Sequence, residues 1–394
     1  MKRTILRVSA VLVLGLAAMG SLQAIPAFSR KYSLSCKTCH APFPSLKKYG
    51  REFAAKGYTI PDKEAPRSVI DTGDGTLTLL RELPLSLRLD GFITFNNSNT
   101  KRIDLASPAV VKLLSGGEIA KGFSYYLYFK MSDRGRVVGL EDAFLTASNL
   151  FGTGLNLSLG QFQVTRPIFN RELRLTLEDY RIYTITPGWS RINLAFDRGF
   201  LLNYRLPTKT DLTLEVLNGM GQEPAGDKGN YDFDKFKNFL ARVSQDLGGL
   251  MRVGGFAYLG WEKQYNVRND MWMLGADLSL ASAPFYLNAQ YVERRDNNPY
   301  FRYEVVPDDV PSLATRGAFA ELTFLPKGDD SRWYATGLFN WVSSDEGSQA
   351  FLSITAHFGY LLSRNLRLTF EGTYYLDAPQ GSHPRLALGL ITSI

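Results

Sequence analysis

The sequence predicts an all-β protein, a sixteen-stranded antiparallel transmembrane β-barrel preceded by a small helical segment. Two observations predict the barrel. From Pro84 onward, apolar and polar residues alternate in short runs, the period of strands that present one face to each environment. The links between these runs alternate between short turns, such as Gly248-Gly249, and long connections, such as 219–237, as in outer-membrane barrels. A soluble β-sandwich, which would bury the apolar faces between two sheets, is the alternative.

Residues 1–24 have the composition of a secretory signal peptide. Lys2, Arg3 and Arg7 precede a short apolar stretch, and we expect cleavage after Ala24. No later stretch supplies the ~20 consecutive apolar residues of a membrane helix. Without the three signal cations, 42 Lys and Arg stand against 38 Asp and Glu, a balance too mild to indicate nucleic-acid binding.

A Cys-x-x-Cys-His motif, Cys36 to His40, lies near the start of the mature chain. In an exported protein this motif predicts one covalently attached haem c, with thioethers to Cys36 and Cys39 and with His40 as the proximal iron ligand. A disulfide or half of a metal site is the alternative. Cys36 and Cys39 are the only cysteines, so the cysteine pair of a zinc site is not repeated, and a thioredoxin-like redox pair would need a βαβ context that the sequence lacks.

Residues 25–83 form the segment that carries the motif. Leu46, Tyr49 and Phe53 place an apolar stripe on a short helix that Gly57 can close, and we expect this stripe to pack on a haem face. The other side of the helix is basic, and it either pairs with haem propionates or stays solvated: Lys47, Lys48, Arg51 and Lys56. A segment this short buries little core of its own, so it should lean on a cofactor or on the barrel.

The residues around the motif resemble the signature of a known family. The motif is preceded by Ile25-Pro26-Ala27-Phe28-Ser29-Arg30 and followed by Pro44-Ser45-Leu46, Tyr49-Gly50-Arg51-Glu52-Phe53 and Gly57-Tyr58. This pattern resembles the N-terminal signature of the fused monohaem cytochrome–porins of bacterial outer membranes, which include outer-membrane iron-oxidation cytochromes. The resemblance covers residues 25–58 and implies a haem segment joined to a porin-like barrel that takes part in extracellular electron transfer.

The barrel is expected over residues 84–394. Its predicted strands lie near residues 84–96, 116–131, 136–149, 153–163, 173–186, 194–206, 209–218, 238–247, 250–262, 270–281, 284–295, 313–325, 331–344, 349–361, 365–377 and 383–394. The fifth of these, 173–186, also suits a loop folded inward because it is rich in charge. We keep it as a strand because a barrel that starts and ends in the periplasm needs an even number of strands.

The haem segment is expected to plug the barrel lumen. The apolar band of such a barrel is ~25 Å tall, and electron tunnelling falls exponentially with distance, so a haem below the membrane would not reach a partner outside it. The distal haem ligand is not evident from the segment. The candidates in the segment are Lys47, Lys48 and the amine of Ile25, and an open sixth position is the alternative. In the barrel, strand parity points Met271, Met273 and His357 into the lumen, and His383 begins the last strand at the outer rim. We select His357 because bis-histidine ligation gives a low-spin electron-transfer haem.

The predicted function is electron transfer across the outer membrane through one haem c, from extracellular Fe(II) to a periplasmic c-type cytochrome. The chain would then be a ferrous iron:cytochrome c oxidoreductase. Acidic residues in the predicted external loops are candidate encounter sites for Fe(II), since hard cations prefer oxygen ligands: Asp308 and Asp309, with Asp296, Asp345 and Glu346. Two alternatives are outward electron delivery to extracellular acceptors and a diffusion porin with a structural or sensory haem. No motif of nucleotide binding or nucleophilic catalysis is present.

Overall fold

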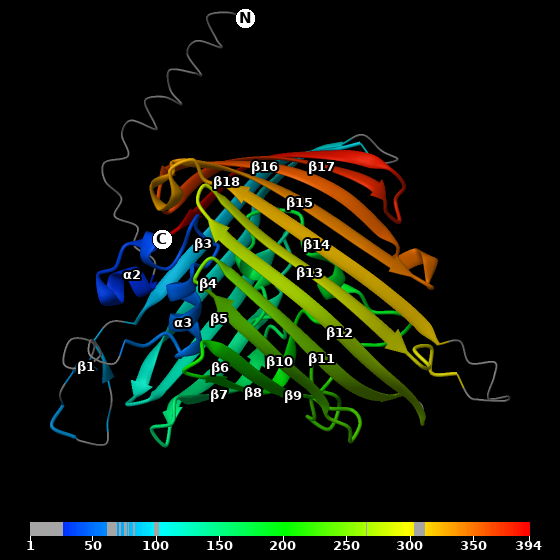
Figure 1. Cartoon of the computed structure of the whole chain (residues 1–394), viewed down its shortest axis with the longest axis horizontal. Coiled ribbons are helices and arrows are strands. Elements are labelled where there is room, and N and C mark those ends of the chain that lie inside the picture. The colour runs from blue at the N-terminus through cyan, green and yellow to red at the C-terminus, as the bar shows by residue number, and fades with distance from the viewer. Residues whose placement is uncertain are drawn as a thin grey trace, which may run out of the picture.

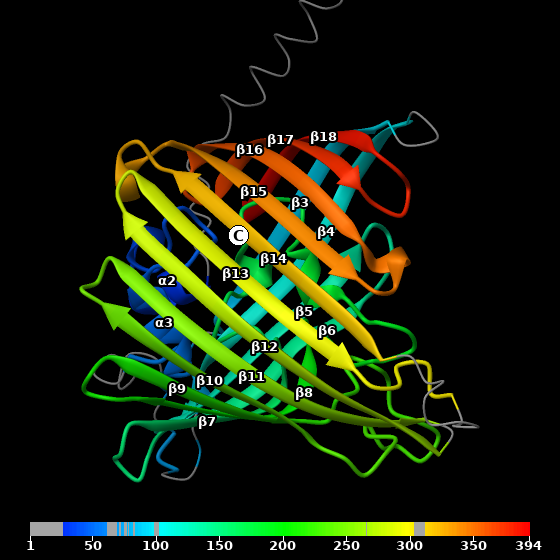
Figure 2. The same ribbon diagram turned by 45° about the vertical axis from the view of Figure 1, so that its right-hand side comes forward.

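A closed barrel of sixteen antiparallel strands, β3 to β18, dominates the fold (Figures 1 and 2). The computed structural model describes residues 27–60, 69–70, 72–74, 77, 79–81, 83–97, 102–264, 266–302 and 312–394. Each strand pairs with its neighbours along the chain, and β18 pairs with β3 to close the barrel. The predicted fold class is therefore confirmed.

The strands of the barrel have the following bounds: β3 Leu85–Asn96, β4 Arg102–Ala120, β5 Phe123–Asp133, β6 Gly139–Leu150, β7 Leu155–Phe162, β8 Asp197–Arg205, β9 Thr210–Leu217, β10 Asn238–Leu247, β11 Met251–Gln264, β12 Val267–Ser282, β13 Phe285–Asp296, β14 Leu313–Phe324, β15 Trp333–Ser344, β16 Phe351–Ser363, β17 Leu366–Asp377 and β18 His383–Ser393. A separate pair, β1 (Val69–Ile70) and β2 (Leu79–Leu80), lies outside the barrel.

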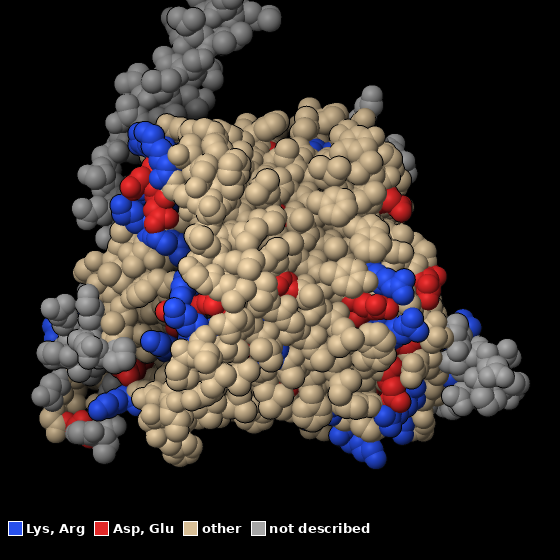
Figure 3. All heavy atoms as spheres, viewed as in Figure 1, with Lys and Arg blue, Asp and Glu red and all other residues tan. Residues whose placement is uncertain are grey.

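The two faces of the strands differ as their sequence alternation predicts. In β17, Leu368 and Phe370 are exposed on the outer face, whereas Arg367, Thr369 and Glu371 are buried on the inner one. Charged side chains gather toward the two ends of the barrel, and the broad outer face between them is largely uncharged (Figure 3). An apolar belt around a polar interior is the surface of an outer-membrane barrel. No helix among the described residues is long and apolar enough to cross a bilayer.

The predicted strand at 173–186 is wrong. Residues 163–196 form a long connection between β7 and β8 that folds into the lumen, and we call it the lumen loop. It contains two short 3₁₀ helices, η2 (Arg171–Leu173) and η3 (Arg181–Thr184). Tyr180 and Tyr183 are buried in the largest apolar cluster of the lumen, and the Tyr180 ring stacks on Phe319 with 4.1 Å between centroids. The charges of this segment are therefore a sign of a loop inside a polar lumen.

Strand β4 was not predicted as a separate strand, and it compensates in the count of sixteen for the strand wrongly predicted at 173–186. The prediction merged part of it with β5 in a single strand at 116–131, whereas β4 begins at Arg102 and Lys121-Gly122 form a tight turn. The register of β3 and β4 shifts between Asp90 and Phe92, which leaves residues 107–109 outside the regular pairing. Pro108 lies in this bulge, where a proline that cannot donate to the ladder is tolerated.

The N-terminal segment occupies one open end of the barrel, which we call the plug end. It comprises α2 (Ala27–Tyr32), η1 (Cys36–Thr38) and α3 (Lys48–Ala55). Figures 1 and 2 place α2 and α3 at the end where β3 begins and β18 finishes. The long connection 218–237 and residues 297–302, which follow β13, lie at the opposite end, which we call the far end. Since long loops are external in outer-membrane barrels, the plug end is the periplasmic one.

Ion pairs hold the basic residues of the segment against the plug end. Lys47 contacts Asp329, and Lys37 Nζ lies 3.0 Å from Asp330; both acids belong to η5 (Gly328–Asp330) in the β14–β15 turn. Lys48 Nζ lies 3.2 Å from Asp246, at the end of β10. The basic side of α3 therefore meets carboxylates of the barrel.

Candidate functional site

The Cys-x-x-Cys-His motif forms a compact turn that brings its three functional side chains together. Cys36 begins η1, and its carbonyl oxygen accepts hydrogen bonds from the backbone N–H of Cys39 at 3.2 Å and of His40 at 3.0 Å. Coiling the chain in this way places Cys36, Cys39 and His40 in the lining of one cavity. Both cysteines are free thiols, and both are partly buried. The alternative of a disulfide pair is not what this structure contains.

Helix α3 packs closely against the motif because of a glycine. A Cβ atom built on Gly50 would overlap the carbonyl oxygen of Cys39, so only glycine allows this approach. The same carbonyl accepts a hydrogen bond from the Lys47 backbone N–H at 2.8 Å, just before the helix begins. Phe53, on the buried side of α3, then faces the cavity beside Leu46.

The ring of His40 is oriented for metal ligation. Its Nδ1 atom lies 2.7 Å from the carbonyl oxygen of Pro44, a distance at which Nδ1–H donates to that oxygen. The proton is thereby kept on Nδ1, and Nε2 carries the free lone pair that binds a metal. Burial lowers the pKa of His40 to about 4, so the imidazole is neutral at ordinary pH. Burial and the neighbouring Cys36 raise the pKa of the Cys39 thiol.

The cavity is lined mainly by aromatic and aliphatic side chains of the segment and by strands of the barrel. It encloses about 1170 Å³ free of protein atoms, its open mouth included. Its apolar lining includes Phe28, Tyr32, Phe43, Leu46 and Phe53. Two adjacent thiols, an imidazole with a free Nε2 and an apolar enclosure are the donor set and surroundings that haem c requires, so the residues fit this group.

Two basic residues of the barrel lie in the cavity wall opposite the motif. Arg88 of β3 is held by Asp90 through two hydrogen bonds of 2.8 and 2.7 Å. Lys112 of β4 is buried between Glu141, at 2.8 Å, and Glu172 of the lumen loop. These cations are positioned to pair with carboxylates of a group bound in the cavity. The sequence had offered either that role or simple solvation to the basic side of α3, with Lys47, Lys48, Arg51 and Lys56.

An aromatic stack that was not predicted from the sequence joins the segment to the barrel wall. Phe28 stacks on Tyr58 with 4.9 Å between ring centroids, and Tyr58 stacks on Tyr126 of β5 at 4.5 Å. Tyr126 in turn stacks on Phe144 of β6 at 5.2 Å. The sequence singles out Phe28 and the Gly57-Tyr58 pair only as parts of the pattern around the motif, and it does not indicate that their rings stack.

A second, larger cavity lies on the far side of this site, and we call it the vestibule. It contains about 3270 Å³ free of protein atoms on the same measure, and it is lined by β3, β4, β5, β16, β17, β18 and the lumen loop. Arg102, Arg134 and Gln380 place its mouth at the far end, since they follow or begin the strands there. Arg88, Lys112 and Glu172 line both cavities, so these three side chains form the wall between them.

Two predicted site residues lie apart from the cavity of the motif. Tyr49 is 43% exposed and does not line it. His357 points into the lumen, as parity predicts, but lines the vestibule. Its Nδ1 lies 3.0 Å from Glu371 and its Nε2 lies 3.4 Å from the Tyr334 hydroxyl. The structure therefore does not bring His357 to the face opposite His40.

The candidate iron-encounter acids have other partners where the structure describes them. Asp296 ends β13 and is buried against Arg294, 2.6 Å away, so its prediction as a loop residue is wrong. Asp345 accepts from the Ala314 backbone N–H, and Glu346 accepts from the Gly188 backbone N–H, each at 2.8 Å. Asp308 and Asp309 lie outside the described residues. No cluster of three His, Cys, Asp or Glu suited to a metal ion occurs among the residues that the structure describes.

The barrel is similar to solved porins. The outer membrane channel DcaP of Acinetobacter baumannii matches with a TM-score of 0.58 and 13% identity, over 79% of this chain and 97% of that one. An anion-selective porin from Comamonas acidovorans matches with a TM-score of 0.60 and 10% identity, over 79% and 99%. OmpF of Salmonella typhi in complex with daunomycin gives 0.56 and 12%, over 81% and 98%. No protein-family model and no curated protein matches the chain. The shared property is the porin fold.

Proposed function

We propose that this porin-type barrel is a single-haem electron conduit, with haem c attached to Cys36 and Cys39 and ligated by His40. The observation that carries the proposal is the placement of these three side chains in one apolar cavity at the plug end, with the His40 Nε2 atom left free. The resemblance of the flanking residues to cytochrome–porins supports the same conclusion. Bound there, the haem would supply one-electron redox chemistry.

The chain's own residues have separate tasks in this proposal. Leu46 and Phe53 exclude water from one side of the cavity, and Tyr58 closes it through its aromatic stack. Arg88 and Lys112 supply positive charge for propionates on the barrel side. A periplasmic c-type cytochrome is the proposed partner at the plug end, and an extracellular reductant, Fe(II) in the first instance, is the proposed partner at the far end.

The proposal is tested with the mature chain produced in cells that attach haem c. We expect a reduced α band of a c-type haem that remains with the protein after denaturation, and its loss in Cys36→Ala/Cys39→Ala. The barrel of this double variant should still migrate as a folded species before heating, because the thiols make no structural bond. A double variant that keeps a covalent haem would overturn the proposal.

Direction of electron flow is tested in the same protein by stopped-flow spectroscopy. Rapid appearance of the reduced α band on mixing the oxidised protein with Fe(II) supports inward flow. A haem that dithionite reduces but Fe(II) leaves oxidised would favour outward delivery to extracellular acceptors.

A diffusion porin is the second candidate, and the likeness of the barrel to solved porins favours it. The lumen loop and the N-terminal segment both occupy the bore, so we expect planar bilayers to show little conductance from the intact chain. A high, steady conductance with the segment in place would support the porin and leave the haem a structural or sensory role.

A further inference from the structure

The vestibule carries more positive than negative charge. Ten cationic residues line it: Arg88, Arg102, Lys112, Lys130, Arg134, Arg171, Arg174, Arg181, Arg367 and Arg385. Seven carboxylates line it with them: Asp90, Asp104, Asp133, Glu172, Glu178, Asp179 and Glu371. Because low-dielectric walls focus the field of such a lining, the surplus is felt strongly by a small ion in the cavity.

The surplus is concentrated in arginines that lack a carboxylate partner. Arg102, Arg134, Arg181 and Arg367 make no ion pair within the described part of the chain, whereas the other six lining cations each have one. Arg367 is 2% exposed, and Arg181 lies over the Phe351 ring at 5.4 Å. The Nε atoms of both Arg181 and Arg367 are buried without a hydrogen-bond partner.

A buried guanidinium without an acid is costly unless an anion compensates it. Arginine is also the side chain that best matches the oxygen atoms of carboxylates and phosphates, because its N–H groups form a rigid planar fork. The four unpaired arginines extend from the mouth, at Arg102 and Arg134, to the inner half of the vestibule, at Arg367. They therefore mark a route for an anion from the far end to the wall that the two cavities share.

We propose that the vestibule binds small polyanions, and that the extracellular redox partner enters it as an anionic metal complex, such as a carboxylate-chelated iron, and not as the bare cation. The inference rests on the proposed function for the identity of that partner. The described acids that were candidates for meeting a bare cation agree with it, because Asp296 is buried against Arg294 in β13 and Asp345 and Glu346 each accept a backbone hydrogen bond. A complex at the inner wall would lie next to Arg88, Lys112 and Glu172. These three side chains alone would then separate it from the cavity of the motif.

The test uses two redox-inert octahedral probes of equal and opposite charge, hexacyanocobaltate(III) and hexaamminecobalt(III). Their binding to the oxidised mature chain in neutral detergent is measured by titration calorimetry at low ionic strength. We expect the trianion to bind and the trication not to bind, and we expect added salt to weaken binding of the trianion by screening. Equal binding of both probes, or no binding of the trianion, would overturn the proposal.

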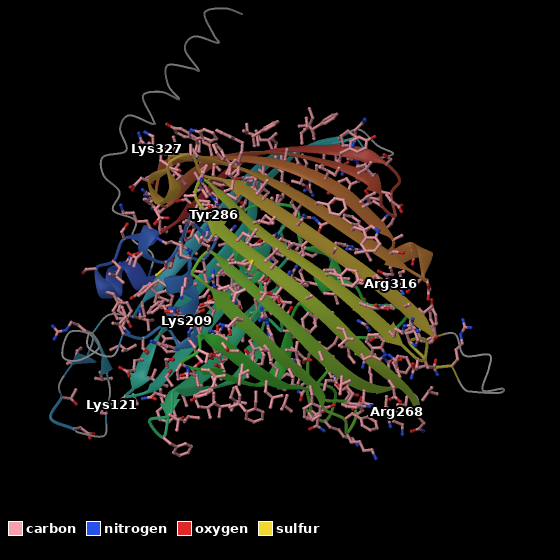
Figure 4. The ribbon with its side chains drawn as sticks, viewed as in Figure 1. Lys121, Lys209, Arg268, Tyr286, Arg316 and Lys327 are labelled. Carbon is pink, nitrogen blue, oxygen red and sulfur yellow. The ribbon has the colours of Figure 1, made fainter. Side chains whose placement is uncertain are left out.

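Variants locate the site. Arg181→Gln removes one charge-assisted partner and should weaken binding of the trianion by roughly tenfold. Arg134→Gln, at the exposed mouth, should weaken it less and cannot harm the core of the barrel. Arg268→Gln is the matched control, because Arg268 lies at the far end outside the vestibule and is paired with Asp270 (Figure 4). Equal losses in Arg268→Gln and Arg181→Gln would mean that surface charge alone attracts the probe.

Failure of this inference is distinguishable from failure of the proposed function. The visible spectrum of the calorimetry sample reports whether a c-type haem is attached, independently of probe binding. A chain that binds the trianion but carries no haem would support the vestibule proposal and contradict the proposed electron conduit. A haem-loaded chain that binds neither probe would contradict the vestibule proposal and leave the proposed conduit unaffected.

Discussion

Arg367 of β17 donates a hydrogen bond from Nη1 to the backbone carbonyl oxygen of Phe43 across 2.7 Å. The bond joins the barrel wall to the loop that follows the Cys-x-x-Cys-His motif. The same Nη1 atom lies 3.0 Å from the Tyr334 hydroxyl, so a single buried guanidinium holds the segment and an inner-face tyrosine of β15 together. The position of the motif therefore depends on a residue more than 300 positions away in the chain.

Arg367→Gln should loosen the N-terminal segment without unfolding the barrel. The substitution leaves the Phe43 carbonyl without its charged donor, which costs roughly 1–3 kcal/mol for a buried group. Trypsin should cleave the lysine-rich segment faster in the variant, as followed by mass spectrometry of detergent-solubilised protein. Arg364→Gln is the control, because Arg364 is an exposed plug-end residue whose Nη1 bonds to the Asp329 carbonyl. Equal cleavage in wild type and Arg367→Gln would contradict the anchoring role.

Gly57→Ala should destabilise the contact between segment and barrel. Gly57 has φ of +69°, and a Cβ there would overlap the Ser124 hydroxyl of β5 and lie 3.2 Å from Thr146 Cβ. Gly152→Ala is a matched control, since its φ is +72° but a Cβ would meet nothing within 4 Å. Gly152→Ala should cost about 1 kcal/mol from backbone strain alone.

The additional loss in Gly57→Ala should be roughly 1–3 kcal/mol, the cost of overpacking a close contact. Urea unfolding followed by tryptophan fluorescence measures both variants. If the two variants lose the same free energy of unfolding, the segment does not press on β5 in the way the structure indicates.

The architecture was largely predictable because its determinants are local. Strand parity in β17 and the bounds of β10 follow from the alternation of neighbouring residues, and haem attachment was proposed from five consecutive positions. Strand β4 was missed because Pro108 interrupts its alternation at a bulge, and a bulge is defined only by the partner strand. The count of sixteen was correct because this missed strand offset the one wrongly placed at 173–186.

The cavity wall that lies opposite the motif could not be predicted from the sequence. Arg88 and Lys112 lie at positions that the alternation of residues along β3 and β4 identifies as facing the lumen. This alternation does not say how far along the barrel axis the motif meets them. The segment is held at its depth by contacts with residues far away in the chain, such as the ion pairs of Lys47 with Asp329 of the β14–β15 turn and of Lys48 with Asp246 of β10. His357 shows the same limit, because its lumenal direction was predictable and its distance from His40 was not.

Lys112→Met should strongly destabilise the inner wall. Lys112 is buried between Glu141 and Glu172, and its removal leaves two buried carboxylates with less compensation, which costs roughly 3–5 kcal/mol. The free energy of unfolding from urea titration measures the loss. Adding Glu172→Gln to Lys112→Met removes one of the two acids and should restore part of the stability. A double variant less stable than Lys112→Met would show that Glu172 is held mainly by other groups, such as its neighbouring arginines.

His357→Ala tests whether this histidine is the distal haem ligand. Both ring nitrogens lie near other groups, Nδ1 at 3.0 Å from Glu371 and Nε2 at 3.4 Å from the Tyr334 hydroxyl, and the ring lines the vestibule. Ligation would require the His357 ring to leave both partners and to move past the side chain of Arg367. We therefore expect the visible spectrum of the haem-loaded protein to be the same in wild type and His357→Ala, with His383→Ala as the control at the far end of β18. A change from a low-spin to a high-spin spectrum in His357→Ala alone would instead assign the distal position to His357 and require the segment to sit deeper in the barrel once haem is attached.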